Sequence, residues 1–257
     1  MGVDYSTVTE VPGNRASHEQ LARMFNRYHF ASNFCEKKDV LEVACGAGQG
    51  LGYLARKARK VVGGDCTEKL VKAAREHYKK RVDIYLLDAH HLPFKDKRFD
   101  VVILYEAIYY LKEPEKFVEE AHRVLRNKGV LIICTVNKDW VDFNPSPFST
   151  RYFSASELFM LLSKKFFSVE LYGAFLTTTD SPKDKLISLI KRMAISLHLI
   201  PTTMKGKELF KRIFLGKLLP LPHEISGGIS EYTPPMPIAL DSPNHDFKVL
   251  YAVAKRN

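Results

Sequence analysis

A glycine-rich stretch that directly follows a short apolar run constrains the fold of this chain more than any other feature. Residues 39–43 have the apolar character of a buried strand, with one acid inside it. Residues 44–50 alternate glycine with small residues, and residues 51–59 resume as a helical pattern. A strand that ends in glycines before a helix brings bare backbone N–H groups up to a ligand. The stretch therefore predicts an α/β fold with a ligand at the end of this strand.

The spacing of the glycines argues against a dinucleotide such as NAD as that ligand. A dinucleotide-binding loop needs the pattern G-x-G-x-x-G. Counted from Gly46, the third glycine position falls on Leu51. Counted from Gly48, it falls on Tyr53. Glu42 is also foreign to that pattern, and it suits a ligand with a cationic end, such as the ammonium group of an amino acid.

The sequence Leu-Glu-Val-Ala-Cys-Gly-Ala-Gly at positions 41–48 resembles the first motif of class I S-adenosylmethionine-dependent methyltransferases, in which an acid precedes G-x-G-x-G. The resemblance implies S-adenosylmethionine as the cofactor and methyl transfer as the activity. The first glycine of the motif is Ala44 here, and we expect its backbone to avoid positive φ. The cofactor-binding residues that this motif implies are Glu42, Ala44, Cys45, Gly46 and Gly48.

A second acid ends the next predicted strand, residues 60–65. Asp65 lies 23 residues beyond Glu42, where an acid reaches the ribose hydroxyls of a bound nucleoside. Alternatively, Asp65 could cap the helix predicted at 68–80, although Thr67 could serve as that cap instead. Because the strand, the acid and the helix all fall where the first motif requires, we favour the ribose-binding role.

A third acid follows the strand predicted at 81–87. Asp88 begins the sequence Asp-Ala-His-His-Leu-Pro-Phe, which resembles the D-A-x-x-L-P-F segment of the family. In the family this Asp accepts a hydrogen bond from the adenine amino group, and the N–H of the next residue, here Ala89, donates to the ring. Two further expected cofactor-binding residues are Cys66, after the second strand, and Leu104, at the end of the fourth.

The acceptor chemistry is expected after the fourth predicted strand, residues 98–104, because chemistry collects at the strand ends of open α/β sheets. Residues 105–111 read Tyr-Glu-Ala-Ile-Tyr-Tyr-Leu. They carry neither the Asn/Asp-Pro-Pro-aromatic turn of adenine- and amide-nitrogen methyltransferases nor the Pro-Cys of cytosine C5 enzymes. Each candidate for the catalytic role could instead be structural. The favoured candidates are Glu106 and Tyr109, and His91 and His223 are less favoured alternatives.

The N-terminal residues are expected to form an irregular arm followed by one helix. Residues 1–17 contain a Pro-Gly-Asn turn, and Ser17 can cap a helix over 18–35. In the family, a helix just before the first strand often closes over the cofactor, so Arg27 or Tyr28 could contact it. The apolar stripe of this helix favours the alternative that Tyr28 packs in the core.

The remaining patterns predict a Rossmann-like α/β fold with a seven-stranded, mostly parallel sheet that ends in a reversed strand. The methyltransferase domain is expected to comprise residues 1–175 and 247–257, with the arm and first helix at 1–35. No metal site is expected, because no cluster of metal ligands is visible. The later elements are a helix at 114–125 stopped by residues 127–129, a strand at 130–135, a helix at 154–165 with a capping box, and strands at 166–175 and 247–254.

Residues 176–246 are expected to form an insertion between the sixth and seventh strands that carries most of the excess charge. Of the net charge of +10, the segment 183–217 contributes +7, with nine Lys/Arg and two acids. Helical patterns at 181–197 and 205–218 have apolar stripes, which predict a helical lid over the acceptor pocket. A basic amphipathic pair of this kind is also typical of helices at a membrane interface.

The chain is expected to transfer a methyl group from S-adenosylmethionine to an O or N nucleophile of a small molecule: a sugar, a phenolic or polyketide-like compound, or a lipid-linked precursor. The alternatives are an RNA methyltransferase that uses the basic insertion and a non-catalytic S-adenosylmethionine-binding protein. The nearly balanced charge outside the insertion disfavours nucleic acid as a partner. We expect a cytoplasmic monomer or homodimer. The sequence has no signal-peptide core, no apolar run of about 18 residues, and four cysteines without C-x-x-C spacing.

Overall fold

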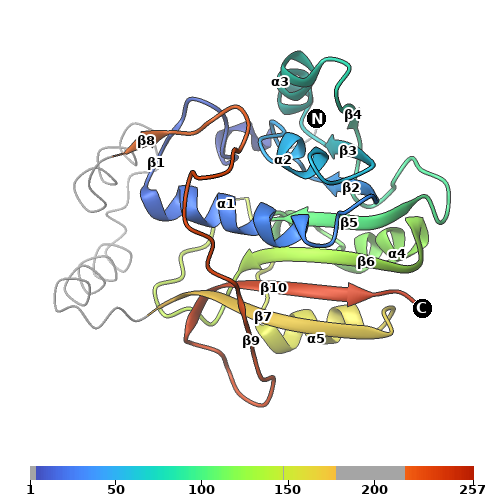
Figure 1. Cartoon of the computed structure of the whole chain (residues 1–257). Helices are drawn as coiled ribbons and strands as arrows, with labels where there is room; N and C mark the ends of the chain where they lie inside the picture. Colours follow the sequence, from blue (N-terminus) through green and yellow to red (C-terminus); the bar gives the residue numbers. More distant parts are fainter. Residues whose placement is uncertain (1–3, 147, 178–217) are drawn as a thin grey trace.

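The fold is built on one mixed β-sheet. The computed structural model describes residues 4–146, 148–177 and 218–257. The strands of the sheet are β2 (Asp39–Val43), β3 (Lys60–Asp65), β4 (Asp83–Leu86), β5 (Phe99–Tyr105), β6 (Leu125–Val136), β7 (Ser168–Leu176), β9 (Met236–Pro237) and β10 (Phe247–Lys255). Their order is β4-β3-β2-β5-β6-β10-β7-β9 (Figure 1). The strands from β4 to β6 pair in parallel, and β10 runs antiparallel between β6 and β7. The seven predicted strands are confirmed, and the two-residue β9 extends one edge.

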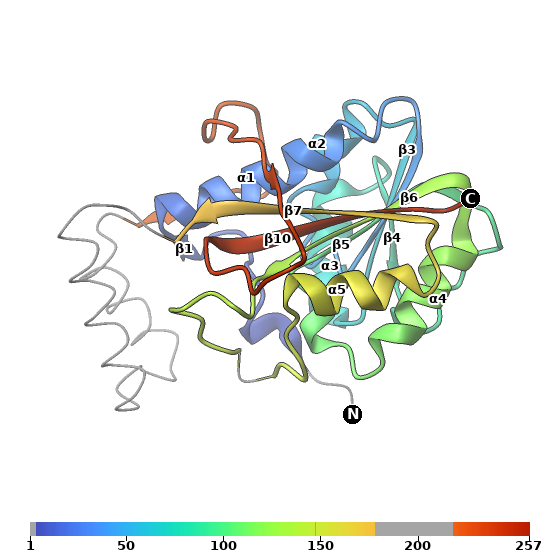
Figure 2. The same ribbon diagram turned by 90° about the horizontal axis from the view of Figure 1, so that it is seen from below.

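Helices cover both faces of the sheet, because successive residues of a strand point to opposite faces. The helices are α1 (His18–Ser32), α2 (Leu51–Ala55), α3 (Glu68–Tyr78), α4 (Pro114–Val124) and α5 (Ala155–Ser163). In β2, Val40 packs in one buried cluster with α1, α2 and α3. Leu41 packs in the other with α4 and α5. Figure 2 shows α1 and α2 on one side of the sheet and α4 and α5 on the other. The central strand β2 is therefore buried along its whole length.

The predicted cap at Ser17 and the predicted capping box at Ser154 are confirmed, and the cap at Ser17 is also a capping box. The Ser17 hydroxyl accepts from the backbone N–H of Gln20, and the Gln20 side chain accepts from the backbone N–H of Ser17. Ser154 and Glu157 make the same reciprocal pair at the start of α5. Each box satisfies two backbone donors that a helix start leaves without a partner, which fixes where the helix begins.

Several predicted helix ends are wrong by a few residues. Helix α1 ends at Ser32 rather than Cys35, and α2 ends at Ala55 rather than Arg59. Residues 127–129 do not stop α4. They lie inside β6, which begins directly after Val124. Helix ends depend on tertiary contacts that the local pattern does not contain.

The N-terminal arm is more ordered than predicted. It contains one 3₁₀ turn, η1 (Tyr5–Thr7), which Asp4 caps by accepting from the backbone N–H of Ser6. Strand β1 (Arg15–Ala16) then pairs antiparallel with β8 (Leu219–Pro220) (Figure 1). The backbone N–H of Gly13 also donates to Leu221 O at 3.0 Å. The arm is therefore held at its C-terminal end by a segment more than 200 residues away in sequence.

Most of the expected insertion lies outside the described residues, including the helix predicted at 181–197 and all but Leu218 of the helix predicted at 205–218. The described stretch 218–246 is without helix and crosses α1 (Figure 1). Asn26 of α1 fixes this stretch with its side-chain amide. Its Oδ1 accepts from the Thr233 N–H at 2.8 Å, and its Nδ2 donates to Glu231 O at 3.1 Å.

The helical lid stays a prediction. Among the described helices, none has the length and apolar character needed to cross a membrane.

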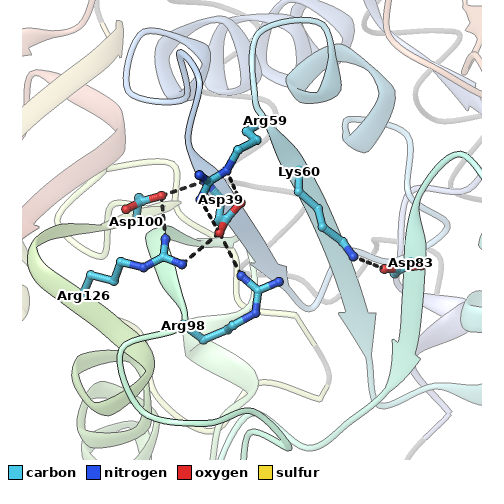
Figure 3. Close-up of polar contacts among 7 residues, drawn as sticks. All are labelled: Asp39, Arg59, Lys60, Asp83, Arg98, Asp100 and Arg126. Carbon is cyan, nitrogen blue, oxygen red and sulfur yellow. Dashed lines mark hydrogen bonds and ion pairs between the residues drawn. The ribbon is translucent and has the colours of Figure 1, made fainter.

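At the N-terminal ends of the central strands, three arginines converge on one buried carboxylate (Figure 3). Asp39 Oδ2 accepts from Arg59, Arg98 and Arg126 at 2.6, 2.8 and 2.9 Å. Asp100 accepts from Arg126 at 2.8 Å and from the backbone N–H of Asp39 at 2.8 Å. The hydrogen bond from Arg59 is foremost in holding the pKa of Asp39 well below its ordinary value.

We expect the substitution Asp39→Asn to lower the free energy of unfolding by about 2–3 kcal/mol, because the arginines lose their charged acceptor. Asp83→Asn is the matched control, since its ion pair with Lys60 leaves both side chains 49% exposed (Figure 3). The loss of unfolding free energy in Asp83→Asn should stay below about 1 kcal/mol. Urea unfolding at pH 7 measures both, and equal losses in the two variants would contradict the assignment.

The effect of Asp39 should also depend on pH in one direction. A carboxyl whose pKa is lower in the folded state stabilises the fold above its unfolded pKa of about 4. That stabilisation is lost as the pH falls further. The difference between wild type and Asp39→Asn should therefore shrink as unfolding is repeated below about pH 4.

Candidate active site

A cavity of about 750 Å³ opens where β2, β3, β5 and β6 end, at the opposite end of the sheet from Asp39. The arm, α1 and the loops that follow β4 and β5 contribute the rest of the wall. The predicted site residues that line the cavity are Tyr28, Glu42, Ala44, Cys45, Gly46, Asp65, Cys66, Asp88, Ala89, His91, Glu106 and Tyr109. Three predicted residues are not among its lining. The Gly48 carbonyl accepts a hydrogen bond from the Tyr78 hydroxyl of α3. Leu104 is fully buried in the sheet, and the His223 ring stacks on His77.

The glycine loop has the backbone shape of its motif, but one expectation about it is wrong. Ala44 has φ +56°, in the left-handed region that we expected it to avoid. Gly46 and Gly48 have φ +58° and +82°. Hydrogen bonds to strand β3 hold the loop in this shape, from the Cys45 N–H to Gly64 O at 3.0 Å and from the Gly46 N–H to the Asp65 carboxylate at 2.9 Å. These contacts offset the cost of a left-handed alanine.

Ala44→Gly should therefore raise the free energy of unfolding by up to about 1 kcal/mol, because glycine adopts positive φ without the penalty of a Cβ. Ala47 lies in the same loop without positive φ, so Ala47→Gly is the matched control. That variant should lose about 0.5–1 kcal/mol. Chemical denaturation compares the two, and a similar loss in both variants would show that the left-handed backbone at Ala44 carries no strain.

Glu42 is buried at the end of β2 with only half of its carboxylate satisfied. Its Oε1 accepts from the Tyr28 hydroxyl at 2.5 Å, whereas its Oε2 is buried and has no hydrogen-bond partner among the described residues. Burial raises the pKa of Glu42 to about 7, although Tyr28 and Arg27 oppose the rise. A buried carboxylate of this kind is stabilised by a cationic ligand group. Tyr28 is thus core-packed, as favoured, and also lines the cavity and orients Glu42.

Asp65 joins the second strand to the glycine loop. One carboxylate oxygen accepts from the Gly46 N–H at 2.9 Å, and the other accepts from the Thr67 N–H at 2.8 Å. Neither bond reaches a donor inside α3, so the alternative role as a helix cap is wrong, and Thr67 holds the cap position without a side-chain bond. Burial raises the pKa of Asp65. Its position on the cavity wall leaves it available to ribose hydroxyls, which donate to a carboxylate.

Asp88, His90 and His91 line the cavity on the side of the loop that follows β4. Asp88 Oδ1 accepts from the His90 N–H at 2.9 Å and pairs with His90 Nδ1 at 2.6 Å. The neighbouring His91 is exposed at the rim. The sequence pattern does not distinguish His90 from His91, and the contact of His90 with Asp88 is evident only in the turn that follows β4.

Glu106 and Tyr109 lie together beyond the end of β5. The Tyr109 hydroxyl donates to Glu106 Oε2 at 3.1 Å, and the Cys134 thiol faces Oε1 at 3.8 Å. Glu106 has φ +50°, and its backbone N–H donates to Cys134 O at 2.8 Å. Burial raises the pKa of the Glu106 carboxyl, although Arg27 opposes it. A carboxylate with a raised pKa at a cavity wall suits a proton acceptor at neutral pH.

The arm and α1 supply cavity residues that the sequence analysis did not predict. Tyr5, Thr9 and Glu10 come from the arm, and Arg23 comes from α1. The Tyr5 ring packs on Tyr110 with centroids 5.1 Å apart. The sequence shows that this segment lies just before the first strand, where it could approach the cofactor. That position does not indicate which of its side chains face the cavity.

The described residues fit S-adenosylmethionine, because the unpartnered Glu42 oxygen and the Asp65 carboxylate match its ammonium and ribose groups. We therefore expect the affinity for the product, S-adenosylhomocysteine, to rise with pH between 6 and 8. The ligand needs the charged form of Glu42, whose pKa in the free protein is about 7. Binding then lowers that pKa and releases a proton, and affinity falls by up to about tenfold per pH unit below 7.

Calorimetry in buffers of different ionisation enthalpy measures this proton release. In Glu42→Gln, binding should be weaker, and the pH dependence over this range should disappear. Proton uptake on binding, or an unchanged pH profile in Glu42→Gln, would contradict the role given to this side chain.

Known proteins share both the motifs and the fold. Residues 41–133 match the family described as "Methyltransferase domain". A probable S-adenosylmethionine-dependent methyltransferase of Mycolicibacterium smegmatis is 35% identical over 182 residues, which cover 66% of this chain and 70% of that relative. The phthiotriol/phenolphthiotriol dimycocerosates methyltransferase 1 of Mycobacterium ulcerans is 36% identical over 126 residues, which cover 47% of this chain and 44% of that relative. The chain thus matches less than half the length of the second protein.

A solved structure shows the same fold. The SAM-dependent methyltransferase of Thermotoga maritima, described as a possible histamine N-methyltransferase, has a TM-score of 0.56 at 19% identity and covers 93% of this chain and 95% of its own. At that identity the likeness concerns the fold alone. The match to the Mycolicibacterium smegmatis protein extends over more than two thirds of that protein. This chain therefore belongs to the class I S-adenosylmethionine-dependent methyltransferases and takes its methyl group from S-adenosylmethionine.

Proposed function

We propose that the protein methylates a small molecule at an O or N nucleophile, and that the preferred nucleophile is a hydroxyl group. The observation that carries this proposal is the half-buried Glu106 carboxylate at the cavity, hydrogen-bonded to Tyr109. An amine that is already free of its extra proton needs only alignment for methyl transfer. A hydroxyl group needs a proton acceptor, and Glu106 supplies one.

The chemistry divides between the cofactor and the chain. The cofactor supplies a methyl group bonded to positively charged sulfur. The chain positions the acceptor oxygen in line with that carbon, and alignment of this kind provides much of the rate acceleration. Glu106 takes the hydroxyl proton as the new O–CH₃ bond forms and the C–S bond breaks, while Tyr109 holds the carboxylate in place. Burial raises the pKa of Glu106, which brings its basicity nearer to that useful at neutral pH.

A small acceptor is supported by the walls of the cavity. The arm residues Tyr5 and Thr9 line it, and its volume of about 750 Å³ is in the range of small-molecule sites. The end of β5 has neither of the two turns that hold a nucleic-acid base. The related protein of Mycobacterium ulcerans is named for phthiotriol-type compounds, which supports a lipid-linked or phenolic acceptor class here.

We expect Glu106→Gln to lower kcat by about 10²–10⁴-fold, because the amide cannot accept the proton. Tyr109→Phe should give a smaller loss, since the carboxylate remains but is less firmly held. Initial rates with a panel of phenols, sugars and amines measure these effects. The affinity for S-adenosylhomocysteine should stay unchanged in both variants, which separates catalysis from cofactor binding.

His91→Gln is the matched test of the other candidate base, and it should leave kcat within about twofold, because an exposed side chain at the rim is a poor base for a buried hydroxyl. A large loss of kcat in His91→Gln, with no loss in Glu106→Gln, would show that His91 and not Glu106 is the proton acceptor. Methylation of RNA alone, with a steep dependence on salt concentration, would overturn the small-molecule proposal.

A further inference from the structure

The turns at the N-terminal ends of the parallel strands, together with the end of β10, form one strongly basic surface. Its segments contain 14 lysines and arginines, of which 11 have exposed side chains, and only two acids. The chain outside residues 183–217 has a net charge of only +3, so its cations are concentrated at this end of the sheet. The surface is called the basic face below, and its segments are residues 36–38, 57–60, 95–98, 126–128, 164–167 and 255–257.

Neighbouring acids do not balance the charge of the basic face. Five acids outside its segments pair with its cations, and counting them still leaves a surplus of seven positive charges. Two of the five lie under its centre, where the arginines converge (Figure 3). The five acids are Asp39, Asp83, Asp100, Glu119 and Glu170. A surplus of this size attracts an anionic partner.

Backbone hydrogen bonds join the segments of the basic face into a continuous surface. They run from the Lys37 N–H to Lys57 O at 2.9 Å, from the Lys128 N–H to Asn257 O at 3.3 Å, and from the Phe167 N–H to Lys255 O at 3.0 Å. The arginines around Asp39 connect the turns before β2, β3 and β5 to the start of β6 (Figure 3). Figure 1 shows the C-terminal end of β10 beside the turn between α5 and β7. The cations are therefore held at one end of the sheet by its own architecture.

One large apolar side chain projects from the basic face. Phe167 is 78% exposed, more than any other large apolar side chain among the described residues, whereas the adjacent Phe166 is buried. Lys164 and Lys165 directly precede these two rings in the sequence, and Lys255 is hydrogen-bonded to the Phe167 backbone. A projecting aromatic ring framed by lysines suits an anionic lipid surface, where the ring enters the headgroup region and the lysines meet the phosphates.

A nucleic acid would also match the charge, but it is less suited to the ring and to the position of the face. Bases stack against the flat face of an aromatic side chain. A platform ring of that kind rests on the protein with its other face, whereas Phe167 projects with 78% of its surface exposed. The basic face also lies at the opposite end of the sheet from Glu106, so a nucleic acid bound here would lie away from the cavity.

We propose that the basic face docks on the surface of an anionic membrane, with the Phe167 ring in the headgroup region. The lysines supply an attraction that salt screens, and the ring supplies apolar burial that salt does not weaken. The cavity opens at the other end of the sheet, so it faces the solution in this orientation. Docking of this kind does not depend on which acceptor the protein methylates.

Co-sedimentation of the full chain with vesicles tests the charge of the face. The wild type should bind phosphatidylcholine vesicles that contain phosphatidylglycerol, less so as the salt concentration rises, and should not bind vesicles of phosphatidylcholine alone. The double variant Lys38→Gln/Lys164→Gln removes one lysine from each side of the face and should weaken binding by about 10- to 30-fold. The matched control Lys72→Gln/Lys138→Gln removes two exposed lysines outside the face and should stay within about threefold.

Substitutions at Phe167 test the depth of docking. Phe167→Ser should weaken binding by about 5- to 10-fold, whereas Val141→Ser, at a 60% exposed side chain beyond the end of β6, should have no effect. Phe167→Trp should retain binding, and its emission should shift to shorter wavelength on anionic vesicles. Trp140 is the only tryptophan of the wild type and also lies beyond β6, so the wild-type emission should stay unchanged.

The affinity for S-adenosylhomocysteine should be the same in all of these variants, which shows that they are folded. Vesicle binding that survives both Lys38→Gln/Lys164→Gln and Phe167→Ser would be carried elsewhere, such as by the basic segment 183–217, and would overturn the proposal. Absence of vesicle binding, equal binding to neutral vesicles, or tight salt-dependent binding of RNA in place of vesicles would also overturn it. A failure of Glu106 as the base would instead appear in turnover, with vesicle binding intact.

Discussion

Burying a carboxylate in this sheet has opposite consequences at its two ends, and the rest of the structure follows from that contrast. At the N-terminal ends, Asp39 meets three guanidinium groups, and its pKa is lowered. At the carboxyl ends, Glu42 and Asp65 are buried and Glu106 is half-buried, none of them has a matched cation of that kind, and the pKa of each is raised. A buried charge must be paired or neutralised. The first end therefore stabilises the fold, and we propose that a ligand completes the second.

The part of the site that follows from the sequence is the part built from residues close together along the chain. The strand, the glycines and the acids Glu42, Asp65 and Asp88 all sit at strand ends, and parallel strands bring such ends to one edge of a sheet. The cap at Ser17 and the capping box at Ser154–Glu157 were predicted for the same reason, since a cap and its partner lie within one helical turn. The left-handed backbone at Ala44 was missed, because its cost is offset by hydrogen bonds to β3 that only the folded chain supplies.

The rest depends on contacts between distant segments. Asp39 looks like an ordinary first residue of a strand until Arg59, Arg98 and Arg126 are seen to converge on it. The arm likewise has no motif, and its place at the cavity depends on pairing between β1 and β8, over 200 residues apart. Residue patterns fix which face of an element is apolar. They do not state which side chain of an arm or helix turns into a cavity, so Glu10 and Arg23 were recognised as cavity residues only from the structure.

The central claim is that the cavity at the carboxyl ends of the strands is completed by the cofactor. A crystal structure of the protein with S-adenosylhomocysteine tests it most directly. The account predicts the ribose hydroxyls on Asp65, the amino-acid group beside Glu42, and a hydrogen-bond partner for the Glu42 oxygen that has none among the described residues. Ligand bound elsewhere, or bound in the cavity with that oxygen still without a partner, would contradict it.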